Sequence, residues 1–138
     1  MGERWWPEPD AGDIVWCHFP EDRGIDPGPK PRPALIIKVF DDNAPNYVVL
    51  VAYGTSQKTD LLRSGEFLIS NRNITAYQLS GLSFSTKFSF QNTVELPYCS
   101  DWFKVPPNST NRQKPTLGVL HPSLLKQAGA AWVAVQSD

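Results

Sequence analysis

The sequence has little of several features that would assign a function class at once. It contains only two cysteines, Cys17 and Cys99, and two histidines, and these four residues are not at metal-ligand spacing. It also contains no Gly-rich phosphate loop and no nucleophilic serine motif. A zinc site, a P-loop and a serine hydrolase centre are therefore not expected. Cys17 lies in an apolar run, so we expect buried free thiols in a reducing cytosol, with a single disulfide as the open alternative.

An excess of charge and long apolar runs are also missing. The 13 Lys and Arg residues against 14 Asp and Glu residues give a net charge of −1, so binding of nucleic acid would need a local basic cluster. No stretch approaches the length of a membrane span, and the start, MGERWWPEPDAG, has no apolar core of a signal peptide. We therefore expect a cytoplasmic protein without a membrane segment.

Proline and tryptophan are abundant instead, with 13 and five residues among 138. A chain of this length can bury its own core, and we expect one domain over residues 1–138, in which residues 1–11 form an irregular arm. Many prolines without a sustained helical period favour short strands and ordered loops over a helical bundle.

Strand-like segments rich in β-branched and aromatic residues recur along the chain. They are residues 12–19, 34–40, 47–53, 66–70, 86–92 and 115–120. A helical pattern begins at Pro122 near the end of the chain. Its apolar face consists of Leu124, Leu125, Ala128, Trp132 and Val135. The expected fold is mainly β (α+β): a small, strongly curved antiparallel sheet with a C-terminal amphipathic helix and room for a short additional helix in residues 71–82.

The most patterned stretch, GPKPRPALIIKVFDDNAPNYVVLVAYGTSQK at residues 28–58, predicts a hairpin. Two apolar runs flank the turn formers of DDNAPN, and both are continuous enough to be buried on both faces of a small barrel or sandwich. With the turn centred between Asn43 and Ala44, antiparallel partners have numbers that sum to 87. Arg32 then lies opposite Thr55.

The hairpin presents this arginine with little conformational freedom. Pro31 and Pro33 fix their own φ angles and restrict the residue before each of them, which includes Arg32. At the other strand end, Gly54 allows an unusual backbone angle or the close approach of a ligand.

A guanidinium beside two hydroxyls has a clear chemical use. Together with Thr55 and Ser56, Arg32 suits an oxyanion such as phosphate, or a carboxylate of a partner protein. The structural alternative is that Arg32 pairs with Asp13 or Glu66 at a barrel rim while the hydroxyls end a strand.

These residues resemble the MazF/PemK (Kid) toxins of bacterial toxin–antitoxin pairs. Those toxins have a Gly-Asp/Glu at the start of strand one, an Arg-Pro-(Ala/Val) at the start of strand two and a Thr-Thr or Thr-Ser after strand three. The similar stretches here are GDIVWCHFP, PKPRPALII and YVVLVAYGTSQK, within residues 12–58. The resemblance implies an SH3-like barrel with helices that is usually a homodimer. It also implies a metal-independent, cofactor-free endoribonuclease that acts on single-stranded RNA and is neutralised by a cognate antitoxin.

By position, the resemblance implies that Arg32 is the catalytic arginine and that Thr55 and Ser56 are the catalytic hydroxyls. The implied reaction is attack by the 2′-oxygen of the RNA on the adjacent phosphate, which yields a cyclic phosphate and a free 5′-hydroxyl. Such a reaction needs positioning, charge stabilisation and proton transfer.

The chain departs from the family at two points. It lacks the Glu-Gln that commonly precedes the arginine, and the later-strand Arg-x-Asp is replaced by Lys87 and Ser89 in STKFSF. Lysine supplies charge without a bidentate fork, and serine cannot act as a carboxylate base. The general base is therefore open, with His18, Glu21 and Asp22 as candidates.

Further RNA contacts are predicted from charge and aromatic character. The candidates for binding RNA are Lys30, Lys58, Lys87, His18 and Glu21. The aromatic candidates for base stacking are Tyr53, Trp16 and the pair Trp5–Trp6, which are equally compatible with a core position.

Two alternatives to a nuclease stay open. In the first alternative, the chain is a catalytically weakened or non-enzymatic protein on the same fold. It would bind RNA, or a protein partner as the gyrase-poisoning CcdB does. In the second alternative, the chain is an unrelated small barrel that serves as an interaction module. The missing Arg-x-Asp pattern and the slightly acidic net charge favour a binding role over catalysis.

Overall fold

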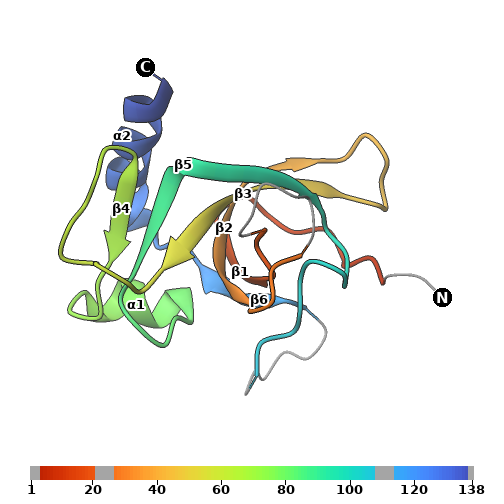
Figure 1. Cartoon of the computed structure of the whole chain (residues 1–138), viewed down its shortest axis with the longest axis horizontal. Helices are drawn as coiled ribbons and strands as arrows, with labels where there is room; N and C mark the ends of the chain where they lie inside the picture. The colour runs from red at the N-terminus through yellow and green to blue at the C-terminus, as the bar shows by residue number, and fades with distance from the viewer. Residues whose placement is uncertain (1–3, 21–26, 108–113, 137–138) are drawn as a thin grey trace.

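The computed structural model describes residues 4–20, 27–107 and 114–136. Its centre is a six-stranded antiparallel sheet with the strand order β4-β5-β3-β2-β1-β6 (Figure 1). The strands are β1 (Asp13–Cys17), β2 (Arg32–Phe40), β3 (Val48–Thr55), β4 (Glu66–Ile69), β5 (Thr86–Pro97) and β6 (Thr116–Val119). The α-helices are α1 (Ile74–Ser80) and α2 (Leu125–Gln136), and a short 3-10 turn (Pro122–Leu124) precedes α2. The expected mainly β fold with a C-terminal helix and a short additional helix is confirmed.

Irregular pairing bends this sheet into a half-barrel. On β3, Ala52 pairs with Thr93 of β5 but the next residue, Tyr53, pairs with Ser89, so residues 90–92 of β5 have no partner on β3. Extra residues on one strand bend that strand and increase its twist. Figure 1 shows β5 changing direction along its length, and only its first part pairs with β4.

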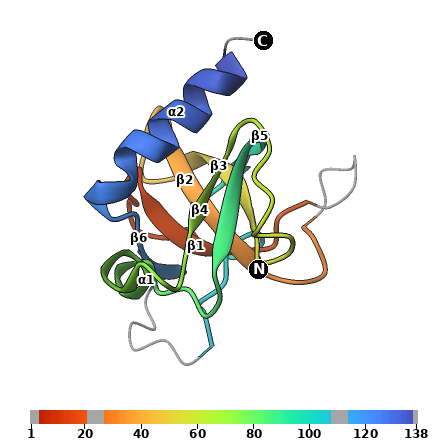
Figure 2. The same cartoon turned by 90° about the vertical axis from the view of Figure 1, so that its left-hand side faces the viewer.

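Apolar side chains are buried on both faces of the sheet, as the continuous apolar runs of β2 and β3 predict. Ala34 and Ile36 of β2 belong to one core cluster, which also contains Trp6 from the N-terminal arm. Leu35, which points to the opposite face, belongs to a second cluster that includes Ala128 of α2. Figure 2 shows α2 lying across the sheet, so this helix covers the second face.

The apolar face of α2 agrees with the predicted pattern at all but one position. Leu124 and Ala128 are buried, and Trp132 packs edge-on against Phe90 with ring centroids 5.5 Å apart. Leu125 is 59% exposed, so its place on the predicted face was wrong. Within the described parts of the chain, no helix is long and apolar enough to cross a membrane.

The described part of the N-terminal arm packs against the core. Trp5 forms a β-bridge with Cys99, and the backbone N–H of Trp6 donates to the Tyr98 carbonyl oxygen at 3.1 Å. The Trp6 side chain is buried, and its indole N–H donates to the Phe103 carbonyl oxygen at 3.1 Å. Trp6 is therefore a core residue, and it is not available to stack on RNA bases.

The two cysteines are separate, buried thiols. Cys17 and Cys99 are both free, which answers the question of a disulfide. Burial raises the pKa of the Cys17 thiol well above its ordinary range. The thiol stays protonated and unreactive near neutral pH.

Two glycines allow α1 to lie directly on β6. Gly81 ends α1 with a φ of +71°, a conformation that glycine adopts without strain. A Cβ atom at Gly81 would overlap the Leu117 carbonyl oxygen, and one at Gly118 would overlap the Leu79 carbonyl oxygen. The backbones of α1 and β6 are therefore in direct contact. This contact fixes the position of Gly81, from which the segment after α1 continues.

The close contact can be tested by adding a methyl group to it. We expect Gly118→Ala to lower the free energy of unfolding by about 1–3 kcal/mol, because backbone atoms of α1 must move. The matched control is Gly129→Ala on α2, where a Cβ atom would have no heavy atom within 4 Å. We expect the control to raise the free energy of unfolding by about 0.5–1 kcal/mol through helix propensity. Urea denaturation measures both changes, and equal changes in the two variants would rule out the contact.

Candidate functional site

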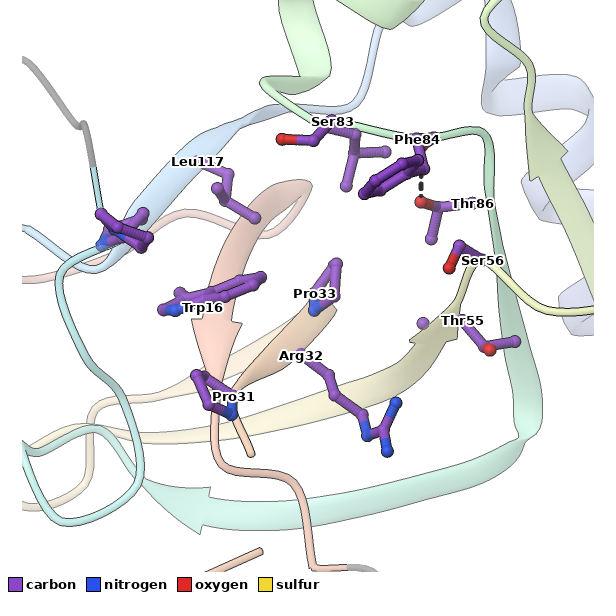
Figure 3. A pocket seen from close by; sticks show the side chains of 14 residues that line it. Trp16, Pro31, Arg32, Pro33, Thr55, Ser56, Ser83, Phe84, Thr86 and Leu117 are labelled. Atoms are coloured by element: carbon purple, nitrogen blue, oxygen red, sulfur yellow. Dashed lines mark hydrogen bonds between the residues drawn. The ribbon is translucent and has the colours of Figure 1, made fainter. Parts of the chain in front are cut away.

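A cavity of about 290 Å³ opens where β2 begins and β3 ends (Figure 3). Arg32, Thr55 and Ser56 line it together. Figure 3 shows the Arg32 side chain extending from the start of β2 toward the end of β3, where both hydroxyl residues lie. The structure thus gathers the three residues that were predicted to be catalytic, and their catalytic roles stay a prediction.

The pairing of β2 with β3 produces this arrangement. Ala34 pairs with Tyr53, Leu35 with Ala52 and Ile36 with Val51, so the residue numbers sum to 87 at this end of the hairpin. Nearer the turn the pairs sum to 88, as in Lys38 with Leu50, because the register shifts at Ile37. The predicted register therefore holds at the cavity, whereas the predicted centre of the turn was wrong.

The side chain of Arg32 lies over an aromatic ring. Its guanidinium carbon is 5.9 Å from the centroid of the Tyr53 ring, and that ring contacts Phe19 edge-on at 5.2 Å. Such cation–π stacking orients the plane of a guanidinium. The two carboxylates that the structural alternative required have other partners. Glu66 forms an ion pair with Lys87, and Asp13 accepts a hydrogen bond from the Asp10 backbone N–H.

The hydroxyls at the cavity differ in what they can still donate. Thr55 Oγ1 accepts a hydrogen bond from the Gln57 backbone N–H at 3.1 Å, so its own proton stays available for a ligand. Ser56 is exposed at the rim. Thr86, a further lining residue, donates to the Phe84 carbonyl oxygen at 2.8 Å, which leaves its oxygen as an acceptor. With Ser83, which also lines the cavity, the site offers a cation and four hydroxyl groups.

Gly54 serves packing rather than an unusual backbone angle. Its φ is not positive, and a Cβ atom there would lie 2.6 Å from the Pro33 carbonyl oxygen and 2.7 Å from Cε1 of Phe88. The neighbours that approach it are thus parts of β2 and β5. Because glycine has no Cβ atom, β2, β3 and β5 can pack closely against one another at this position.

Lys87 lies outside the cavity. It is buried, its Nζ donates to the Leu61 carbonyl oxygen at 2.8 Å, and it forms an ion pair with Glu66 Oε1 at 3.1 Å. Its prediction as an RNA-binding residue is therefore corrected, because both its charge and its hydrogen bonds are used inside the protein. Thr55 pairs with Lys87 across β3 and β5, so the ion pair supports the strand end that carries the hydroxyls.

His18 contacts Gly28, which precedes β2, and Trp102. Its Nδ1 lies 2.7 Å from the Gly28 carbonyl oxygen, and its backbone N–H donates to the Trp102 carbonyl oxygen at 2.7 Å. Because a carbonyl oxygen only accepts, Nδ1 is the donor in this contact, and Nε2 is the ring nitrogen that remains to contact a ligand. His18 does not line the cavity.

The remaining predicted contacts lie around the cavity or outside the described residues. Lys30 and Lys58 are exposed and do not line the cavity. Glu21 and Asp22 lie outside the described residues. Where the chain is described, no cluster of three or more His, Cys, Asp or Glu residues could hold a metal ion.

The sequence analysis missed one wall of the cavity. Ser83 and Phe84 lie in the segment between α1 and β5, Thr86 begins β5, and the three line the cavity opposite Trp16 and the start of β2 (Figure 3). The available signal was an isolated phenylalanine between serines in SGLSFST, a polar segment with no core pattern around it.

Two comparisons with known proteins bear on this cavity. The family model described as "PemK-like, MazF-like toxin of type II toxin-antitoxin system" matches residues 10–83, which are 74 of the 138 residues. Among solved structures, an endoribonuclease in complex with its cognate antitoxin from Mycobacterial species is similar, with a TM-score of 0.57 and 14% sequence identity. The match covers 94% of this chain and 96% of that chain, and at this identity it shows a shared fold. Of the curated proteins, none matches the chain.

The structural role of Lys87 can be tested by removing its charge. We expect Lys87→Met to lower the free energy of unfolding by about 3–5 kcal/mol, because the largely buried Glu66 carboxylate loses its cation and keeps the hydrogen bond from the Arg63 backbone N–H. In the control, Lys87→Met combined with Glu66→Leu, much of the loss should be recovered. Chemical denaturation gives both values. A single variant as stable as the wild type would contradict a buried ion pair.

Proposed function

Because the chain belongs to the family of PemK-like, MazF-like toxins of type II toxin–antitoxin systems, we propose that it is an endoribonuclease that cleaves single-stranded RNA without a metal ion. One observation carries this proposal: Arg32, Thr55 and Ser56 line a single cavity at one end of the sheet. The family match spans these residues, and the similar solved structure is named an endoribonuclease.

In the proposed reaction, the scissile phosphate lies between the guanidinium and the hydroxyls. The 2′-oxygen bonds to phosphorus as the bond to the 5′-oxygen breaks, so the products are a 2′,3′-cyclic phosphate and a 5′-hydroxyl. Negative charge develops on the non-bridging oxygens, and preorganised donors stabilise it most effectively. Arg32 would supply two donors in its planar fork, and Thr55 would supply its free O–H.

Proton transfer needs a base that takes the 2′-hydroxyl proton and an acid that protonates the leaving 5′-oxygen. Of the described residues that line the cavity, none is such a base, so the base would have to come from outside it, and His18 is one candidate because its Nδ1 contact with the Gly28 carbonyl oxygen leaves Nε2 as the acceptor. Glu21 is the alternative base from the same loop. Arg32 would stabilise the leaving oxygen by donating a hydrogen bond to it, and solvent water would supply the proton, because a guanidinium does not give up its own.

Contacts outside the cavity would bind the rest of the strand. Lys30 lies two residues before Arg32 and Lys58 two residues after Ser56, and both are exposed. We propose that they contact the phosphates on either side of the cleaved one, a role that compensates for the net charge of −1.

The proposed biological setting follows from family membership. A cognate antitoxin would neutralise the chain, as the similar solved structure is itself in complex with its cognate antitoxin. We further propose that the chain is a cytoplasmic homodimer and a single domain over residues 1–138.

A second function on the same fold is favoured by one observation. Of the described residues that line the cavity, none is a carboxylate or a histidine, and Lys87, at the position of the later-strand arginine, is buried in an ion pair. A protein that binds RNA or a protein partner without cleaving it would need no general base.

Cleavage of RNA in the presence of EDTA separates the two functions. We expect the purified protein to cut a mixed-sequence single-stranded RNA into discrete fragments, and Arg32→Ala to lower the rate at least about 100-fold, as loss of a preorganised donor does. Arg32→Lys should recover only part of the rate, because an ammonium lacks the fork.

The matched control is Lys126→Ala, which removes an exposed positive charge from α2 and leaves the cavity intact. We expect this variant to cleave at the rate of the wild type. RNA that stays intact with folded wild-type protein would contradict the nuclease and favour the binding role.

A further inference from the structure

The wall of the cavity formed after α1 carries an exposed aromatic side chain. Phe84 is 69% exposed. Among the exposed large hydrophobic residues of the described segments, it is the most exposed and the sole aromatic one. Its ring lies at the cavity (Figure 3), and it belongs to neither core cluster.

The segment that carries Phe84 is held at both ends. On one side, Gly81 and Gly118 bring α1 onto β6, and Leu82 is buried beside them. On the other side, the Thr86 hydroxyl donates to the Phe84 carbonyl oxygen at 2.8 Å. The exposure of the ring is therefore a property of an anchored backbone, and little conformational entropy remains to be lost when the ring contacts a ligand.

The opposite wall is also apolar. Trp16 and Pro33 face the cavity across from Phe84, and Leu117 of β6 closes the side between them (Figure 3). The volume of about 290 Å³ lies at the lower end of the roughly 300–1,000 Å³ of small-ligand sites. This space suits one flat ring system rather than a paired helix.

The apolar part and the polar part of the cavity are continuous. Arg32, Thr55 and Ser56 line the polar end, and Phe84 and Trp16 line the apolar end of the same space. A nucleotide has the same division, with a charged phosphate and a flat base joined by one sugar. Single-stranded RNA is commonly bound by stacking its bases on aromatic side chains.

We propose that Phe84 stacks on one unpaired base of the RNA, the base of a nucleotide adjoining the phosphate held by Arg32. This inference rests on the proposed ribonuclease function and deepens it, because it assigns a base subsite to the α1–β5 segment. The Ser83 hydroxyl lies along the same wall, where it can bond to the edge of the stacked base. Stacking itself tolerates every base, so this hydroxyl would provide the discrimination.

The test first maps the phosphate that the wild-type protein cleaves in a mixed-sequence RNA. Binding is then measured by fluorescence anisotropy with a short 2′-O-methyl RNA of that sequence, which cannot be cleaved because it lacks the nucleophile. The variants are Phe84→Ala, Phe84→Trp and, as the control, Ile74→Ala. Ile74 is 64% exposed at the start of α1 and does not line the cavity.

We expect Phe84→Ala to weaken binding about tenfold to a hundredfold, as loss of one stacked base does. Phe84→Trp and Ile74→Ala should bind as the wild type does. An abasic ribose placed in turn on either side of the mapped phosphate should weaken binding to the wild type at one of the two positions. At that position it should cause no further loss in Phe84→Ala, because the stacking partner is already absent.

The outcomes separate this inference from the function on which it rests. If the wild-type protein cleaves RNA but Phe84→Ala binds as well as Ile74→Ala, the base subsite is wrong and the nuclease stands. If Phe84→Ala and the abasic substitution weaken binding additively, Phe84 does not contact that base and the inference is likewise overturned. If the wild-type protein neither cleaves nor binds RNA, both proposals fall.

Discussion

The site depends above all on how β2 pairs with β3. Arg32 and Thr55 are far apart in sequence, and they line one cavity because the ladder from Ala34–Tyr53 to Ile36–Val51 carries each strand end to the same place. A slip of one residue would turn every side chain of one strand to the other face. Since apolar side chains are buried on both faces of this hairpin, such a slip would also disrupt both core clusters. The folding of the core therefore determines the position of the guanidinium.

Buried contacts hold the other walls of the cavity. The Lys87–Glu66 ion pair lies beside the end of β3, and the Lys87 Nζ also bonds the Leu61 carbonyl oxygen in the β3–β4 loop. On the opposite side, the contact of Gly81 and Gly118 sets the segment that carries Phe84. Polar and apolar groups are thus placed before any ligand arrives, which is the condition for strong electrostatic stabilisation of a developing charge.

Much of this fold could be predicted from local sequence, and the site only in part. The β-branched runs indicated the strands, and the assumed turn gave a register that holds at the cavity, although a shift at Ile37 displaces the pairs nearer the turn. Lys87 was assigned wrongly, because its burial depends on Glu66 and on the Leu61 carbonyl, which only the folded sheet brings together. Phe84 was missed because its position depends on a backbone contact between α1 and β6, two elements that are far apart in sequence.

The central claim is that the Arg32 end of the cavity binds the phosphate of the RNA strand. The most direct measurement is a crystal structure of the protein with the non-cleavable 2′-O-methyl RNA. The account predicts a phosphate within about 3 Å of both the Arg32 guanidinium and Thr55 Oγ1, the distance of a charge-assisted hydrogen bond. A strand bound elsewhere on the surface, with Arg32 still stacked on Tyr53 and no phosphate beside it, would contradict the account.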